Sequence, residues 1–231
     1  MQAQDMSHRS ISFPLPPEEQ ARADCYALSA SLLLRAPDAE LLSALRSAGP
    51  LASLRADNPL DRAWNALVAS ARESSAEAVH AEFDALFVST GTPPINPYGS
   101  YYLAGFLMEK PLAALRDDLA VLGLRRRYGA GELEDHLGAL CETMRMLIAG
   151  AEAVPRRPLA TQKTFFTRHL APWYARCLDD LRGAPEAAFY CRVADFVQAF
   201  LDLEVEAFSM AQTGEDEAPQ MHDTGMEEQT T

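Results

Sequence analysis

Apolar residues recur at helical spacing along nearly the whole chain, and no segment shows the alternation typical of a β-strand. Caps and prolines mark where helices begin, as Asn58 and Pro59 do before an apolar face that includes Leu60 and Leu67. The pattern predicts helices over about 18–34, 37–48, 75–87, 111–122, 134–148 and 186–210, one that begins at residue 59, and one over about 159–181 that bends near Pro172. The expected fold is therefore all-α.

The predicted helices belong to a single domain. The chain has 231 residues, of which 48% are hydrophobic, and this is enough apolar material to bury a large core. No repeat of fixed period is present, which favours a compact helical bundle over an α-solenoid. We expect the bundle to span residues 18–211, between a flexible N-terminal segment over 1–17 and a disordered acidic tail over 212–231.

The formal net charge of -13 narrows the choice of partner. Nucleic acids need clustered Lys and Arg side chains for their phosphates, so we expect no nucleic acid partner. Six of the acidic residues lie in the tail, and the rest of the chain still carries about seven excess negative charges. The electrostatic field of this excess negative charge attracts a basic peptide.

The most informative stretch covers residues 83–102, where a helix end runs into a loop rich in prolines and aromatic rings. Three apolar side chains share a face of the helix end: Phe83, Leu86 and Phe87. Four loop residues add rings and hydroxyl groups to a stiff backbone: Pro97, Tyr98, Ser100 and Tyr102. This combination suits the apolar stretch of a bound peptide. The alternative is structural, with the helix face in the core and the loop packed on its own neighbours.

A second polar segment opens the helix predicted over 134–148. Glu134 and Asp135 would occupy its first turn, where acidic side chains interact favourably with the helix dipole. Helix capping is therefore one role for Asp135. The other is binding of an arginine guanidinium, which a carboxylate near a hydrophobic groove can hold by charge-assisted hydrogen bonds. His136 would stand beside it as a donor, an acceptor or a pH-sensitive charge.

At these two segments the chain resembles the TorD/DmsD family of cytoplasmic redox-enzyme maturation chaperones. Members of that family carry an aromatic-x-x-Leu-Phe helix end, then Pro-Tyr-x-Ser-x-Tyr, and further on an Asp-His segment that opens a helix. This chain has Phe83-x-x-Leu86-Phe87, then Pro97-Tyr98-x-Ser100-x-Tyr102, then Asp135-His136. In length and helical pattern the resemblance extends over roughly residues 20–210.

The resemblance implies a chaperone that binds the twin-arginine signal peptide of a molybdenum-containing oxidoreductase precursor. It would hold that precursor back from export until the cofactor is inserted. The resemblance also implies that Phe83, Leu86, Phe87, Tyr98 and Tyr102 contact the apolar part of the signal, while Asp135 and His136 face its arginines. Two alternatives stay open: a helical assembly factor that recognises the folded redox subunit rather than its leader, and an enzyme that uses Asp135 and His136 as an acid–base pair.

No motif supports catalysis or a bound metal or cofactor, so we predict none of these. The chain has no Gly-x-Ser-x-Gly elbow, no P-loop and no His-Glu-x-x-His motif. Four cysteines lie far apart, and we expect them to be buried thiols in a reducing compartment: Cys25, Cys141, Cys177 and Cys191. His80 and Asp84 are four residues apart, a spacing typical of a surface pair on a helix.

The sequence also predicts no insertion into a membrane. The longest uncharged apolar-rich run covers residues 25–34, which is too short to span a bilayer, and no secretory apolar region follows the N-terminus. We therefore expect the protein to stay in the cytoplasm. The sequence leaves open the client enzyme, a role for a nucleotide, and the choice between a monomer and a domain-swapped dimer.

Overall fold

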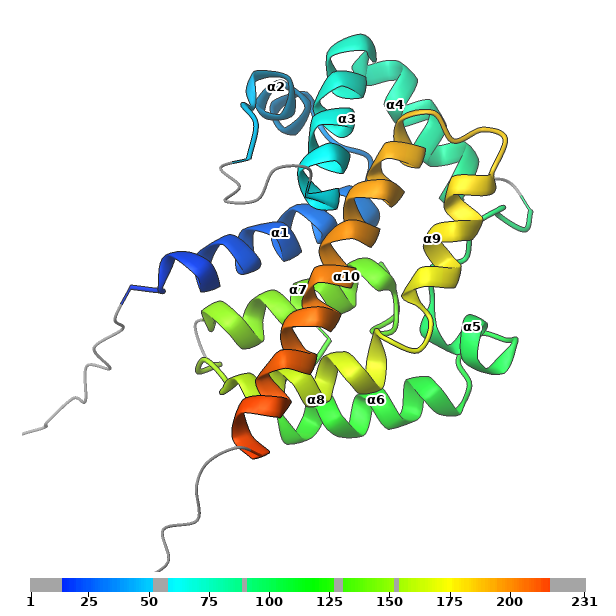
Figure 1. Cartoon of the computed structure of the whole chain (residues 1–231). Helices are drawn as coiled ribbons and strands as arrows, with labels where there is room; N and C mark the ends of the chain where they lie inside the picture. Colours follow the sequence, from blue (N-terminus) through cyan, green and yellow to red (C-terminus); the bar gives the residue numbers. More distant parts are fainter. Residues whose placement is uncertain (1–13, 52–57, 89–90, 127–130, 152–153, 217–231) are drawn as a thin grey trace, which may run out of the picture.

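The computed structural model describes residues 14–51, 58–88, 91–126, 131–151 and 154–216, with side chains as far as Met210. Within these ranges the chain forms α-helices and one π-helical turn, η1, with no β-strand (Figure 1). The elements are α1 (Pro17–Leu34), α2 (Ala39–Ser47), α3 (Pro59–Glu73), α4 (Ala76–Phe83), η1 (Asp84–Val88), α5 (Gly99–Ala104), α6 (Lys110–Val121), α7 (Leu137–Ala149), α8 (Leu159–His169), α9 (Tyr174–Gly183) and α10 (Phe189–Asp216). The predicted all-α bundle is confirmed.

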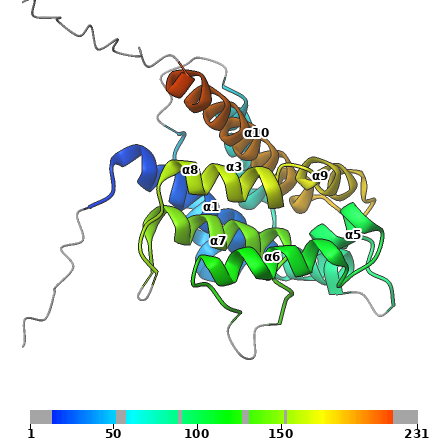
Figure 2. The same ribbon diagram turned by 90° about the horizontal axis from the view of Figure 1, so that it is seen from below.

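Two long helices organise the bundle. α1 packs along α7, and α10 crosses the molecule and packs against α3 and α9 (Figure 1). Seen from below, α7 lies between α6 and α8, and α5 lies beyond one end of α6 (Figure 2). The core between these helices is aromatic, because its largest fully buried side chains include Trp173, Tyr26, Tyr190 and Phe166.

A buried ion pair ties α1 to α10 inside this core. Both nitrogens at one edge of the Arg22 guanidinium, Nε and Nη2, donate to the carboxylate of Glu204 at 2.7 Å. The hydroxyl of Tyr26 donates to the same carboxylate at 3.0 Å. Glu204 is only 2% exposed, so these three donors compensate for the loss of its hydration.

The starts of α3 and α4 match capping residues in the sequence. The side chain of Asn58 accepts from the N–H of Leu60 at the start of α3, and that of Ser75 accepts from the N–H of Ala78 at the start of α4. The helix predicted over 159–181 is broken, as expected, between α8 and α9. These local signals are enough to position helices because each cap satisfies a backbone donor of its own first turn.

Three details of the prediction are corrected. Glu134 and Asp135 do not lie in the first turn of a helix, because α7 begins at Leu137 with His136 as its cap. The residues from Gly99 to Tyr102 are not loop but form most of the short helix α5. α10 extends to Asp216, beyond the predicted domain boundary at 211, while the flexible segment predicted over 1–17 and the tail beyond 216 fall largely or wholly outside the described residues.

The expectation of four buried cysteines holds for two of them, and the predicted surface pair of His80 and Asp84 is present. Cys141 and Cys177 are buried free thiols, whereas Cys25 and Cys191 are partly exposed. His80 Nε2 lies 3.5 Å from Asp84 Oδ2 on the surface. In the part of the chain that the structure describes, no helix is both long and apolar enough to cross a membrane.

Candidate functional site

The two motif segments meet in space. An isolated antiparallel bridge joins Tyr98 to His136. Around it, the N–H of Leu137 donates to the carbonyl of Pro97 at 2.8 Å, and the N–H of Gly99 donates to the carbonyl of Asp135 at 2.9 Å. The residues before α7 are thereby fixed to the residues before α5. The two segments are more than thirty positions apart in the sequence, yet their residues form one cluster: Pro97, Tyr98 and Ser100 from the first, and Asp135 and His136 from the second.

The side chain of Asp135 strengthens this connection but keeps one oxygen free. Its Oδ2 accepts a hydrogen bond from the N–H of Ser100 at 2.8 Å and so caps the first turn of α5. Asp135 is 3% exposed. Within the described residues its Oδ1 has no hydrogen-bond partner, and neither has the Oγ of Ser100. A buried carboxylate oxygen without a donor is unusual, because its desolvation is uncompensated.

His136 is a helix cap with a fixed protonation state. Its Nδ1 accepts from the N–H of Gly138 at 3.0 Å, which requires an unprotonated Nδ1. Burial lowers the pKa of His136 to about 4, although Glu132 and Asp135 work in the opposite direction. The ring is therefore neutral near pH 7 and carries its proton on Nε2.

Tyr98 covers the outer side of His136. The two rings meet edge to face with their centroids 5.1 Å apart. The Tyr98 hydroxyl donates to Glu132 Oε2, and burial together with this hydrogen bond raises the pKa of Tyr98. Tyr98 thus holds the segment that leads into α7 and shields the histidine.

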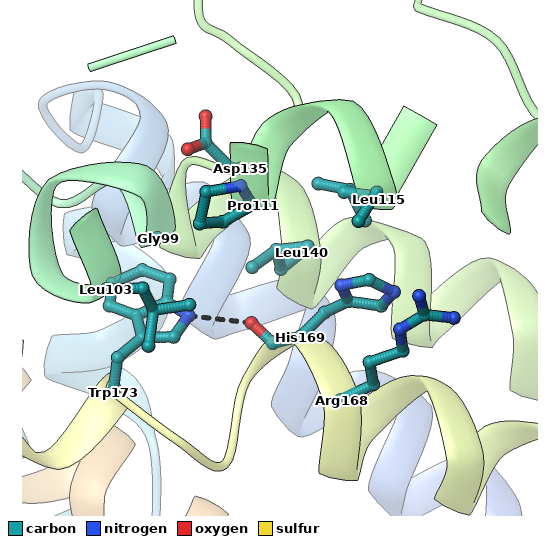
Figure 3. A pocket seen from close by; sticks show the side chains of 10 residues that line it. Gly99, Leu103, Pro111, Leu115, Asp135, Leu140, Arg168, His169 and Trp173 are labelled. Atoms are coloured by element: carbon teal, nitrogen blue, oxygen red, sulfur yellow. Dashed lines mark hydrogen bonds between the residues drawn. The ribbon is translucent and has the colours of Figure 1, made fainter. Parts of the chain in front are cut away.

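A cavity of about 180 Å³ adjoins Asp135. Its walls are mostly apolar and come from α5, α6, the residues before and within α7, the end of α8 and the α8–α9 connection (Figure 3). The side chains that line it include Leu103, Pro111, Leu115, Asp135, Leu140, Arg168, His169 and Trp173. Trp173 is fixed by its Nε1–H, which donates to the carbonyl of His169 at 2.6 Å. The cavity is thus a mostly apolar space with Asp135 at its edge (Figure 3).

The cationic groups at the other end of this cavity are already engaged. Arg168 Nη1 lies 2.8 Å from Asp118 Oδ2, and His169 Nε2 lies 2.7 Å from the same oxygen. Burial lowers the pKa of His169, and the hydrogen bond to Asp118 offsets only part of this effect. Both cationic side chains at this end of the cavity therefore already have Asp118 as a partner, whereas Oδ1 of Asp135 has no hydrogen-bond partner among the described residues.

The apolar half of the first motif lies apart from this cluster. Leu86 is fully buried and Phe83 nearly so, while Phe87 is half-buried. The rings of Phe83 and Phe87 are 4.9 Å apart, and both pack on Tyr190 of α10. The N–H of Ile95 donates to the carbonyl of Leu86, which connects η1 to the loop that precedes Pro97.

Tyr102 faces α9 and the aromatic wall of the cavity. Its ring stacks on Trp173 with centroids 5.5 Å apart and an interplanar angle of 17°. Its hydroxyl donates to Asp180 Oδ2 at 2.8 Å. Tyr102 is 7% exposed and Ser100 is fully buried, so these two side chains lie inside the protein, whereas Tyr98 is half-buried.

Sequence reasoning missed the residues that shape the cavity. Trp173 and His169 flank the break between α8 and α9, and a tryptophan beside a proline break was the one signal available. Gly99 was not singled out either, yet a Cβ there would lie 3.1 Å from Trp173 Nε1. A glycine at this position allows α5 to approach the indole closely.

Comparison with known proteins agrees with this architecture. The family model described as nitrate reductase delta subunit matches residues 54–179, which is more than half of the chain and includes both motif segments. No curated protein matches the chain in sequence.

A solved structure shares the fold. It is the crystal structure of a candidate redox enzyme maturation protein from Archaeoglobus fulgidus, with a TM-score of 0.53 and 17% sequence identity. The match covers 85% of this chain and 99% of that one. Nearly the whole of the archaeal chain is thus reproduced in the helical arrangement described above.

Proposed function

Because the chain belongs to the nitrate reductase delta subunit family of redox-enzyme maturation chaperones, of the TorD/DmsD type, we propose that it binds a twin-arginine signal peptide. The peptide would be the leader of a molybdenum-containing oxidoreductase precursor. The chaperone would act in the cytoplasm, aiding cofactor insertion before export. In this role the protein binds its client and catalyses no reaction.

The observation that carries the proposal is the free Oδ1 of buried Asp135 beside an apolar cavity. An arginine side chain combines an apolar stem with a guanidinium that donates several hydrogen bonds. Its stem matches walls such as Leu115 and Leu140, and its head supplies the donor that Asp135 lacks. A charge-assisted hydrogen bond of this kind contributes roughly 1.5–3 kcal/mol.

The rest of the cluster supports Asp135 rather than the peptide itself. Tyr98, Ser100 and His136 fix the two backbone segments that hold the carboxylate in place. Phe83, Leu86 and Phe87 anchor the preceding loop on the core. We therefore assign these six residues, with Pro97 and Tyr102, a positioning role, and Asp135 the contact with the leader's arginine.

Isothermal titration with signal peptides of molybdoenzyme precursors from the same genome tests the proposal. Each peptide is paired with a variant in which both arginines are replaced by glutamine. We expect saturable binding that is lost in the variant and that weakens as salt is added, since screening reduces the attraction between opposite charges. An affinity that is independent of both the arginines and the salt would overturn the assignment of Asp135.

The same experiment separates this function from the assembly-factor alternative. A factor that recognises the folded redox subunit would retain binding to a mature subunit from which the leader has been removed. A pull-down with leaderless subunit therefore accompanies the titration. Capture of the leaderless subunit together with no peptide binding would replace the leader-binding proposal.

A further inference from the structure

A cluster of exposed apolar side chains lies next to the Asp135 cavity. Tyr101 and Leu103 on α5, and Phe106, Leu107 and Met108 after it, are each at least 41% exposed. Phe106 and Met108 are both 72% exposed. We call these five residues the α5–α6 apolar surface. No charged residue occurs between positions 101 and 108. Exposed apolar side chains gathered in this way are typical of a binding surface.

The backbone of this turn holds the side chains outward. Gly105, with a φ of 86°, ends α5 in the left-handed region. Met108 has a φ of 61°, and it is the only non-glycine residue with a positive φ among those the structure describes. A methionine in this conformation is disfavoured relative to an ordinary turn residue. The same turn therefore combines a disfavoured backbone conformation at Met108 with exposed apolar side chains.

Leu103 connects this surface to the cavity. Its side chain belongs to the α5–α6 apolar surface and also lines the cavity beside Trp173 (Figure 3). Pro111, at the start of α6, lines the cavity as well, so the turn from 103 to 111 borders the cavity at both of its ends. A chain that leaves the cavity on this side passes directly onto apolar surface.

From this continuity we propose that the α5–α6 apolar surface binds the apolar segment that follows the arginines of the leader. The inference rests on the proposed function, and it adds where the second half of the peptide lies. An arginine at Asp135 places the next residues of the leader at Leu103, and their apolar side chains then cover Phe106, Leu107 and Met108. The order of the chemistry in the peptide, cationic and then apolar, matches the order of the site, carboxylate and then apolar surface.

This placement revises the expectation for the apolar contacts. The sequence suggested Phe83, Leu86 and Phe87, but those side chains pack on Tyr190 and the core. The α5–α6 apolar surface offers what they lack, which is apolar area open to a ligand.

The test replaces the two most exposed side chains together, Phe106→Ser and Met108→Ser. Met210→Ser is the matched control, because Met210 is 68% exposed and lies in the C-terminal part of α10. Titrations use a leader peptide and a second peptide that keeps the arginines but has serines in its apolar segment. Unfolding midpoints of all variants are measured alongside.

We expect the double variant to bind the leader about 10- to 100-fold more weakly than the wild type, with an unchanged unfolding midpoint. The control should bind like the wild type. The peptide with serines should bind both proteins equally, because it has no apolar segment to lose.

Other results would overturn the inference in distinguishable ways. Unchanged leader affinity in the double variant, with binding still dependent on the arginines, would refute the role of the α5–α6 apolar surface and leave the proposed function intact. If the wild type binds no leader peptide, both the proposed function and this inference are wrong. If the wild type sediments as a dimer and the double variant as a monomer, the surface serves self-association instead. Capture of leaderless subunit by the wild type alone would reassign it to the folded client.

Discussion

The carboxylate of Asp135 caps α5, through the N–H of Ser100 at 2.8 Å, rather than the helix that Asp135 itself precedes. The cap of α7 is His136, whose Nδ1 accepts from Gly138. Two adjacent residues thus serve two different helices, and the second oxygen of Asp135 remains free. A structural role and a binding role for this residue are therefore compatible, because each uses a different oxygen.

Asp135→Asn should separate these two roles. The asparagine oxygen can still accept from Ser100, so we expect a change in the free energy of unfolding of less than about 1 kcal/mol. The lost charge should weaken leader binding by about 10- to 100-fold. Asp135→Ala, which removes the cap as well, should cost roughly 1–2 kcal/mol of stability. Urea unfolding and isothermal titration measure the two effects, and an asparagine variant with wild-type affinity would contradict the binding role.

The helices were predictable because their signals are local. The period of the apolar positions, caps such as Asn58 and Ser75, and the break at Pro172 each act within one or two turns. α5 was missed for the opposite reason. It has only six residues, and its first turn is capped by a carboxylate that comes more than thirty positions later. Contacts of that kind do not appear in a local pattern.

The candidate site, too, was only partly predictable from the sequence. Its motif residues were identified from the sequence, but periodicity alone could not tell which apolar residues would be covered. Phe83 and Phe106 are both aromatic residues near a helix end, yet Phe83 is 9% exposed and Phe106 is 72% exposed. The difference depends on Tyr190 of α10, which covers Phe83 and is distant in the sequence.

Acid should destabilise the protein partly through His136. The pKa of this buried ring is about 4 in the folded state, against an ordinary value near 6.5 in the unfolded chain. Between these values the unfolded state takes up a proton that the folded state does not. Stability should therefore fall as the pH drops from about 6.5 to 4, by up to roughly 3 kcal/mol from this residue.

Urea unfolding across this pH range measures the effect, and His136→Asn is the control because asparagine still caps a helix. The variant should be less stable than the wild type at pH 7, since it no longer packs on Tyr98. Its stability should also fall less steeply with acid. Parallel pH profiles for the two proteins would show that His136 does not cause the loss of stability in acid. The buried His169, whose pKa is also lowered, would then be the next residue to test.

Glu82 should stabilise the fold from a distance. This α4 side chain accepts hydrogen bonds from three backbone N–H groups at the start of α10, those of Ala188, Phe189 and Tyr190, at 2.8, 3.1 and 2.7 Å. An acidic group at this position satisfies free donors and interacts favourably with the helix dipole. We expect Glu82→Ala to cost about 1–3 kcal/mol.

Glu206→Ala provides the comparison, because Glu206 is an exposed acidic residue further along α10. It should change the free energy of unfolding by no more than about 0.5 kcal/mol. Chemical unfolding of the two variants gives the difference directly. Equal stabilities would mean that the capping hydrogen bonds contribute nothing net.

Gly138 should be required for the packing of α1 on α7. A Cβ at this position would lie 2.8 Å from Leu34 Cγ and 3.2 Å from Leu33 Cβ, so an alanine forces the two helices apart or bends a leucine out of its rotamer. We expect Gly138→Ala to destabilise the protein by about 1–3 kcal/mol, even though alanine is the better helix former. Gly183→Ala is the matched control, since a Cβ there meets nothing within 4 Å. It should be neutral or slightly stabilising.

The same substitution also tests whether the site depends on this helix contact. Gly138 donates to His136 at the start of α7, two residues after His136 and three after Asp135, so a shift of α7 moves the carboxylate as well. Gly138→Ala should therefore weaken leader binding as well as stability, while Gly183→Ala changes neither. Leu34→Ala introduced into the Gly138→Ala variant removes the closest clash, and it should cost less stability there than it does in the wild type. Additive losses in this double-mutant cycle would show that α7 accommodates the extra methyl group without contact with Leu34.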